Sequence, residues 1–298
     1  MVESKRRVGL TFVLATTVAC GQTVSAGDDT ETSDCPELTW ADPDVNTLRV
    51  TTASEADTLP HYTHIEGHLS IKEIPGKTDL SFLECLQEVE GQIGINGLDL
   101  QSLAGLERLE RVEVAAGTWP PGKIEVWGNP KLTSVDGLSG LTHVDRLVVR
   151  GNPLLVSLEG LSALETAQSI VIEDNDALTT VGLRALKSVE GISISPFSCE
   201  SASGIPVRPI YGNNNLVEFD GLDSLETFEE IVIAGNENLK SIEGLSHLSS
   251  ATGLHLITLV QNTSLPYAHI IEFEQQLGYE LGGWVCGNSD DPKPCICF

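Results

Sequence analysis

Residues 147–164 read LVVRGNPLLVSLEGLSAL, and close copies of this stretch recur along the chain. Residues 124–141 read IEVWGNPKLTSVDGLSGL, and residues 231–248 read IVIAGNENLKSIEGLSHL. In each copy an alternating apolar pair is followed by Gly-Asn, then by an isolated Leu and a Gly-Leu pair. Self-similarity of this kind is the sequence signature of a repeat architecture.

The asparagine of each copy gives the period of the repeat. This marker falls, at steps of 23, 23, 38 and 23 residues, at Asn129, Asn152, Asn175, Asn213 and Asn236. Asn96 precedes Asn129 by 33 residues. The sequence therefore predicts a 23-residue coil, with insertions near residues 115–123 and 195–209.

Each copy has the residues that one coil of a solenoid needs. The alternating apolar pair predicts a short strand with one buried face. Gly and Asn suit the turn that follows because both tolerate a positive φ. Asparagines stacked from coil to coil can also bond the backbone of their own turn and of the neighbouring coil. Since a single coil cannot bury its apolar side, we expect stacked coils with a continuous core.

The segment from residue 65 to residue 112 has a more specific pattern. It reads Ile65-Glu66-Gly67-His68-Leu69-Ser70-Ile71 and continues with Val89-Glu90-Gly91, Ile93-Gly94-Ile95 and Gly105-Leu106. This order resembles the receptor L domain, the ligand-binding solenoid of insulin- and epidermal-growth-factor-type receptors, and bacterial surface lipoproteins that carry the same module. The family unit is Ile-x-Gly-Asn-Leu-x-Ile, and His68 replaces its asparagine. The resemblance extends over about residues 45–265 and identifies no individual binding residue.

The expected fold is a β-rich solenoid over residues 35–278, of the right-handed parallel β-helix or leucine-rich-repeat-like kind. A helix over Pro266–Leu277, capped by Ser264 and followed by Gly278, is expected to close its C-terminal end. Cys35 and Cys85 flank the first coil and are expected to pair. The other framework cysteines allow three pairings and include a stapled tail over residues 279–298; they are Cys199, Cys286, Cys295 and Cys297.

The N-terminus reads as an export signal. Lys5, Arg6 and Arg7 precede an uncharged stretch over residues 8–19, which predicts a signal peptide over residues 1–19. Thr17-Val18-Ala19-Cys20 resembles a lipobox, although Thr17 stands where Leu is usual, so Cys20 is the expected lipidation site. Residues 20–34 then form a flexible acidic tether, and the expected location is the outer membrane or cell surface. The alternative is cleavage after Ala26, which leaves a periplasmic or secreted protein.

The composition and motifs argue against several functional classes. A net charge of −26 argues against a nucleic-acid partner, because phosphate binding needs a basic face. Gly117–Lys123 has the spacing of a phosphate loop, but its two prolines remove amides and Ile124 replaces the Ser or Thr that would bind magnesium. We interpret this segment as a hairpin tip. His61, His64 and His68 suggest a metal site, but an irregular loop is favoured, and no metal or cofactor is expected.

One acidic residue precedes the Gly-Leu pair in several coils. The members of this row are Asp136, Glu159, Asp220 and Glu243. They are expected to accept backbone amides at their own turns, while calcium bridging is the alternative. The coil at residues 181–183 lacks the acid and interrupts the row.

The strand pattern predicts which side chains face outward. One outward row is Glu125, Val148, Val171, Ser193, Val232 and His255, and the next is Trp127, Arg150, Glu173, Tyr211, Ala234 and Ile257. The first row holds a single carboxylate, which does not provide the acid pair of a glycosidase. Both insertions, after Val114 and Ile194, are expected to leave the same strand end and flank this face. The candidate partner-binding residues are Trp127, Val148, Arg150, Val171, Glu173, Tyr211, Val232 and Ile257.

These patterns favour a non-catalytic binding protein that recognises a protein or glycan through its sheet face and holds the membrane through its N-terminal lipid. The alternatives are a structural envelope protein without a dedicated ligand and a β-helix carbohydrate-active enzyme.

Overall fold

The computed structural model describes residues 35–42, 44–72, 74–194, 212–250, 256–278, 281 and 285–291. Residues 1–34 and 35–298 form two separate units, and only the second is described below. The expected signal peptide, Cys20 and tether therefore lie outside the described residues, as do the insertion at 195–209 and Tyr211. Cys199, Cys295 and Cys297 lie outside them as well. No helix in the described ranges is long and apolar enough to cross a membrane.

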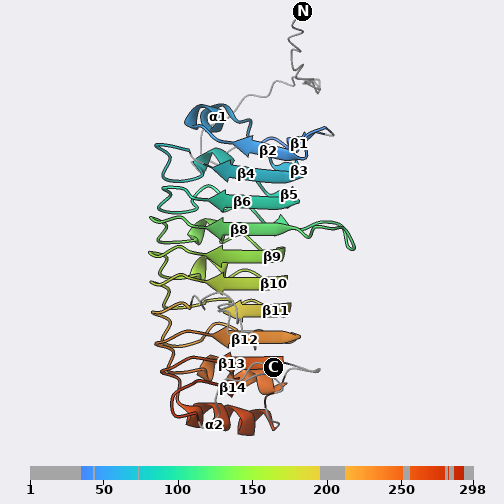
Figure 1. The fold of residues 1–298 in the computed structure, drawn as a ribbon. Helices are drawn as coiled ribbons and strands as arrows, with labels where there is room; N and C mark the ends of the chain where they lie inside the picture. The colour runs from blue at the N-terminus through green and yellow to red at the C-terminus, as the bar shows by residue number, and fades with distance from the viewer. Residues whose placement is uncertain are drawn as a thin grey trace, which may run out of the picture. The chain divides into compact units, whose positions relative to one another are not determined.

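Parallel strands make up most of the described structure (Figure 1). In chain order they are β1 (Thr39–Ala41), β2 (Thr47–Val50), β3 (His64–Glu66), β4 (His68–Lys72), β5 (Glu88–Glu90), β6 (Gln92–Asn96), β7 (Arg111–Val112), β8 (Lys123–Trp127), β9 (His143–Arg150), β10 (Thr166–Glu173), β11 (Ser188–Ile194), β12 (Glu230–Ala234), β13 (Leu256–Val260) and β14 (Val285–Cys286). The helices are α1 (Ala53–Thr58) and α2 (Tyr267–Leu277), with short 3₁₀ turns η1 (Ser81–Leu83), η2 (Asp136–Leu138), η3 (Glu159–Leu161) and η4 (Glu243–Ser250).

The strands join one 14-stranded sheet in which each strand pairs with the equivalent strand of the next coil. The first four coils have two strands each, in the rows β1-β3-β5-β7 and β2-β4-β6-β8. Both rows continue into β9, where Val144 pairs with Val112 and Val149 pairs with Val126. Parallel pairing between successive coils is compatible with the expected β-solenoid.

The core is a column of aliphatic side chains between the strands and the turns. Leu147 and Val149 point inward from β9, and their register partners Ile170 and Ile172 in β10 do the same; all four are fully buried. The isolated Leu of the repeat, such as Leu155, and the Leu of each Gly-Leu pair, such as Leu161, fill the opposite side and are fully buried. The repeated apolar positions of the sequence therefore form one continuous cluster.

The marker asparagines form a buried ladder, as expected from the repeat. The Oδ1 atom of Asn152 accepts the backbone N–H of Asn129 at 3.1 Å, while its Nδ2 donates to the carbonyl of Val126 in the preceding coil. Asn175 repeats both contacts one coil later. These side chains are fully buried, so each satisfies backbone groups that water cannot reach.

The ladder is longer than the sequence pattern suggested. Asn262 and Asn288 continue it, at steps of 26 residues, and donate to the carbonyls of Ile233 and Leu259. Asn96 is not a member, because it pairs with Trp127 at the end of β6. Leu98 takes the ladder position in that coil and donates its N–H to Asn129. The predicted 33-residue step from Asn96 was therefore measured from the wrong residue.

The residue before each ladder position bends the chain through a left-handed conformation. Gly128 and Gly151 have φ values of 65° and 63°. Asp174 and Gln261 hold the same place with φ values of 57° and 55°, although left-handed backbone is costly for residues with a Cβ atom. The turn geometry is therefore constant even where glycine is absent.

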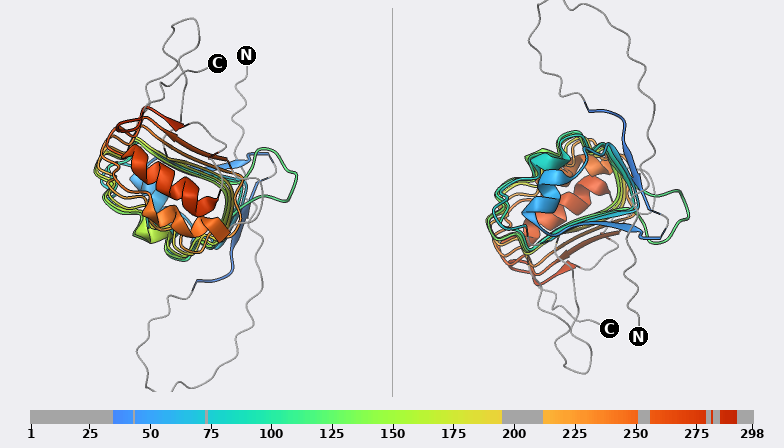
Figure 2. Two further views of the ribbon diagram at one scale, coloured as in Figure 1. Left: turned by 90° about the horizontal axis from the view of Figure 1, so that it is seen from below. Right: turned by 90° about the horizontal axis from the view of Figure 1, so that it is seen from above.

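The two ends of the stack are closed by different devices. Cys35 and Cys85 form the expected disulfide at the N-terminal end. Helix α2 lies across the last coils (Figure 2), with Ile270 and Phe273 buried beneath it. Gly278 ends α2 in a left-handed conformation, as expected. The predicted Ser264 cap is wrong, because Pro266 occupies the N-cap position and no side chain caps the helix.

The two insertions do not leave from equivalent strand ends, in contrast to the expectation. Val112, just before the first insertion, pairs with Val144 in the first strand row. Ile194 pairs with Ile172 at the C-terminal end of the second row. The first insertion instead enters β8 at its N-terminal end, where it projects from the sheet in Figure 1. The same alternation occurs in both rows, so Val112-x-Val114 was assigned to the wrong one.

Candidate functional site

The outward rows are in the expected register through the middle coils. Val148 pairs with Val171, Val171 with Ser193, and Ser193 with Val232. Val148 is only 9% exposed, whereas Val171 and Val232 are half-buried. The next row begins with Trp127, whose register partner is Arg150, which in turn pairs with Glu173.

Trp127, Arg150 and Glu173 form a stack across β8, β9 and β10, which we call the outer stack. The guanidinium of Arg150 lies 5.0 Å from the centroid of the Trp127 ring, in cation–π contact. Its Nη1 donates to Oε1 of Glu173 at 3.0 Å. The Glu173 side chain is 8% exposed, while Trp127 is 46% exposed. The stack therefore has a buried acidic end and an open aromatic end.

Two neighbouring residues shape the outer stack. A Cβ atom at Gly151 would lie 3.4 Å from Cδ1 of Trp127 and 3.6 Å from Oδ2 of Asp174, so the indole and this carboxylate approach the turn from opposite coils. Burial raises the pKa of Asp174 above its ordinary value, the Asp176 carboxylate raises it further, and Arg150 partly offsets both effects. Asp174 was not a predicted site residue.

The predicted row is wrong at the C-terminal coils. Val232 pairs with Thr258 rather than His255, which lies outside the described residues. Ile257 pairs with Ile231 and is 1% exposed in the main core, so it cannot contact a partner. The shift of three residues follows from the 26-residue step between Asn236 and Asn262.

The outer face is also closed near these last strands. Ala234 and Val260 share the row of the outer stack by register, yet both are fully buried. With Cys286 they form a small apolar cluster separate from the main core, and Val232 packs against it. Cys286 is itself disulfide-bonded. Of the predicted partner-binding residues, only those on β8 to β10 therefore lie on an open part of the face.

The first insertion is tied to the sheet by a residue that the sequence pattern did not indicate. Asp145 in β9 is 8% exposed, and its Oδ2 accepts the N–H groups of Val114 and Gly122 at 3.1 and 2.7 Å. Its Oδ1 accepts Nε2 of Gln168 at 2.9 Å. Asp145 stands between two inward apolar residues, Val144 and Leu147, and a single Asp in a strand gives no recognisable motif.

The three N-terminal histidines do not converge. His61 lies 3.7 Å from Glu84, and His64 lies between Glu88 at 3.4 Å and Glu90 at 3.5 Å. His68 instead accepts the N–H of Gln92 at 3.0 Å. In the part of the chain that the structure describes, no group of acidic, His or Cys side chains could hold a metal ion.

The acidic row is bound to its turns differently from the expectation. The N–H groups of Asp136, Glu159 and Glu243 donate to the hydroxyls of the serines two residues earlier. Arg184, from the coil that lacks an acid, lies 3.1 Å from Glu159 and 3.9 Å from Asp220. A cation of the chain therefore bridges the interruption in the row.

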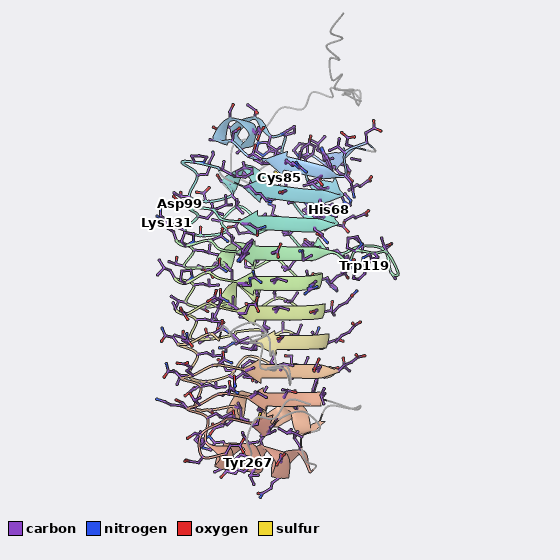
Figure 3. The ribbon with its side chains drawn as sticks, in the orientation of Figure 1. His68, Cys85, Asp99, Trp119, Lys131 and Tyr267 are labelled. Atoms are coloured by element: carbon purple, nitrogen blue, oxygen red, sulfur yellow. A yellow bond between two sulfur atoms is a disulfide. The ribbon has the colours of Figure 1, made fainter. Side chains whose placement is uncertain are left out.

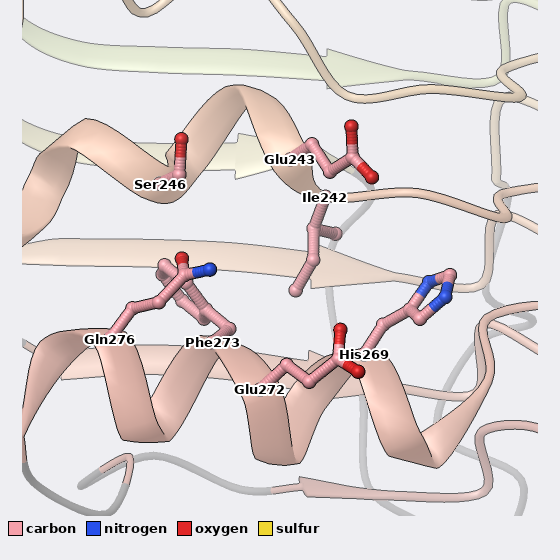
Figure 4. A pocket seen from close by; sticks show the side chains of 7 residues that line it. All are labelled: Ile242, Glu243, Ser246, His269, Glu272, Phe273 and Gln276. Atoms are coloured by element: carbon pink, nitrogen blue, oxygen red, sulfur yellow. The ribbon is translucent and has the colours of Figure 1, made fainter.

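A cleft lies between η4 and α2 at the C-terminal end (Figure 4). Its volume is about 290 Å³, and its polar lining includes Glu243, Ser246, His269, Glu272 and Gln276. Nδ1 of His269 lies 3.1 Å from the carbonyl oxygen of Lys240. This contact occupies the imidazole at the edge of the cleft, so the cleft has no evident nucleophile and base pair.

The comparison with known families agrees with this geometry. Residues 63–162 match the family model of the receptor L domain, which covers β3 to η3 and includes Trp127 and Arg150. The chain matches no curated protein and no solved structure closely enough to count as a relative. The receptor L domain family is generally non-enzymatic, and the match indicates a ligand-binding role.

Proposed function

We propose that this protein is an exported, lipid-anchored binding protein that recognises a protein or glycan partner through the outer stack. In this proposal the sheet is one side of a right-handed β-solenoid with coils of 23 residues. The signal-like N-terminus and the Cys20 lipobox support export and anchoring. The Cys35–Cys85 disulfide supports an oxidising compartment.

The observation that carries the proposal is the open end of the outer stack. Trp and Arg are among the residues that contribute most to interface energies. Here Arg150 is held between the Trp127 ring and Glu173, so both side chains are already ordered before a partner arrives. Ordering in advance lowers the entropy cost of association. The valines of the adjacent row, Val148 and Val171, supply a flat apolar border.

Anchoring can be tested by mass spectrometry of the membrane fraction. The expected mature N-terminus is a lipid-modified Cys20. A mature chain that begins at Gly27 would contradict the anchor and leave a periplasmic or secreted protein.

Partner binding can be tested with the full mature chain immobilised in its native form. Wild-type protein, Trp127→Ala, Arg150→Ala and the control Leu154→Ala are each used to retrieve proteins and glycans from envelope extracts. Leu154 is 50% exposed and lies outside the outer stack, so it controls for the loss of a surface apolar side chain. A specific partner should be retrieved by wild type and Leu154→Ala, and weakly by the other two variants. Equal retrieval by all four variants would favour the structural envelope alternative.

A further inference from the structure

The hairpin between β7 and β8 has a rigid base. Asp145 holds both of its ends through the N–H groups of Val114 and Gly122. At Gly122 a Cβ atom would lie 2.6 Å from Cα of Glu113 and 2.9 Å from Asp145, so the two sides of the hairpin are in direct contact. Gln168 from β10 and Gln92 from β6 add hydrogen bonds to Asp145 and to the carbonyl of Pro121. The hairpin is therefore tied to the coils on either side.

The tip of this rigid hairpin exposes a large aromatic side chain. Trp119 is 86% exposed and projects beyond the sheet (Figure 3), followed by Pro120 and Pro121. Burying a side chain of this size normally stabilises a protein by about 1.5–3 kcal/mol or more, and the hairpin gives up this gain. Prolines restrict the backbone, so little conformational entropy remains to be lost when the ring meets a ligand.

A small open cavity lies beside the ring. Its volume is about 260 Å³, below the range of about 300–1,000 Å³ that is typical of sites for drug-sized ligands. Ala115, Ala116 and Gly117 form one wall without bulky groups. The polar groups on the lining belong to Thr118, Asp145 and Gln168. Among the described lining residues there is a carboxylate and no Lys or Arg.

We propose that this cavity binds a neutral sugar residue of a glycan. A pyranose ring has an apolar C–H face and a rim of hydroxyl groups, so it needs a flat apolar surface next to hydrogen-bonding groups of both kinds. The Trp119 indole provides the surface. The Gln168 amide donates and accepts, the Thr118 hydroxyl does both, and the Asp145 carboxylate accepts from sugar hydroxyls. A single ring suits the size of the cavity.

The electrostatics favour a neutral sugar over an acidic one. The Asp145 carboxylate is part of the lining, and the chain carries a net charge of −26. A uronate or sialate would bring a second carboxylate close to Asp145, which is unfavourable at short range. This site is separate from the outer stack, because the hairpin precedes Lys123 and Trp127 ends the same strand. The inference therefore does not depend on the proposed partner site.

The test uses the full mature protein on an array of immobilised neutral and acidic oligosaccharides. The neutral oligosaccharide that binds best is then titrated against wild type, Trp119→Ala, Gln168→Ala and the control Leu154→Ala by calorimetry. We expect saturable binding that Trp119→Ala weakens at least about tenfold, equivalent to about 1.4 kcal/mol. Gln168→Ala should weaken it by a smaller factor, and Leu154→Ala should leave it unchanged.

Melting temperatures keep this test independent of folding. Trp119 is almost fully exposed, so its substitution should leave the thermal unfolding of the protein unchanged. Binding of no oligosaccharide, or of acidic ones only, would overturn the proposal. Wild-type affinity in the Trp119→Ala variant would overturn it as well. Trp127→Ala is not a control here, because loss of the proposed partner site would then be confused with loss of the sugar site.

Discussion

Two stacks of side chains run through the same coils and lie in opposite environments. The asparagine ladder passes from Asn129 through Asn152 to Asn175 inside the turns, where each side chain is fully buried. The outer stack passes through the same three coils on the sheet face and opens to solvent at Trp127. A buried polar stack has to be complete, because an unpaired group costs more than a pair gains. An exposed stack has no such constraint, and its residue types are free to serve binding.

The first prediction tests the ladder at its centre and should give the largest effect. Asn152→Ala removes the acceptor of the Asn129 N–H and the donor to the Val126 carbonyl. Each buried group that is left unpaired costs about 1–3 kcal/mol, so the melting temperature should fall sharply. The matched control is Ser139→Ala, at an exposed position of the neighbouring coil, which should be nearly neutral. Equal melting temperatures for the two variants would contradict a structural role for the ladder.

Most of this ladder could be predicted from the sequence, because Gly-Asn recurs with the apolar pattern around it. The pattern does not reach Asn262 and Asn288, where the step lengthens to 26 residues and Gln261 replaces the glycine before Asn262. That longer step also moved Ile257 from the core to the surface in the prediction. The error has a physical origin: a strand slipped by an odd number of residues presents its other face.

The candidate site was less accessible to sequence reasoning. Alternation correctly placed Trp127, Arg150 and Glu173 in one outward row. It could not show that Ala234 and Val260, in the same row, are fully buried, because their cover comes from tertiary contacts. Asp145 was missed for a related reason. Its role depends on two amides that lie 31 and 23 residues away in the chain.

The second prediction tests the outer stack from within. Arg150→Ala leaves the Glu173 carboxylate, 8% exposed, without the guanidinium at 3.0 Å. A poorly solvated charge that loses its partner should destabilise the protein by about 1–3 kcal/mol. Trp127→Ala removes only a half-exposed ring and should change the unfolding free energy by about 0.5 kcal/mol or less. Denaturant titration of both variants checks this. A larger loss for Trp127→Ala would mean that the ring, rather than the ion pair, supports the stack.

The third prediction concerns the turn that the two stacks share. Gly151 has a φ of 63° and connects Arg150 to Asn152. Gly151→Ala should cost about 1 kcal/mol, because left-handed backbone penalises a Cβ atom. Gly191 in β11 is the matched control: its φ is not left-handed and a Cβ atom there meets nothing within 4 Å. Gly191→Ala should be neutral or slightly stabilising, since it restricts the unfolded chain. The two variants differ only in backbone conformation, so equal stabilities would remove the turn strain from the account.

The fourth prediction is the smallest and asks whether the carboxylate beside the outer stack is held at a cost. Burial and Asp176 raise the pKa of Asp174 above its ordinary value of 3.8, so the folded state favours the protonated form. The wild type is therefore relatively more stable below the unfolded pKa, and it loses that stability as the pH rises through the folded pKa. Asp174→Asn removes the charge, while asparagine tolerates the left-handed φ of 57° as well as aspartate does. At neutral pH the variant should be slightly more stable than wild type, by no more than about a few tenths of a kcal/mol because solvent screens a largely exposed group. The difference should vanish below about pH 3, where wild-type Asp174 is protonated in both states. A variant that is less stable than wild type at neutral pH would show that attraction to Arg150 outweighs the other two effects and that Asp174 belongs to the ion-pair network of the outer stack.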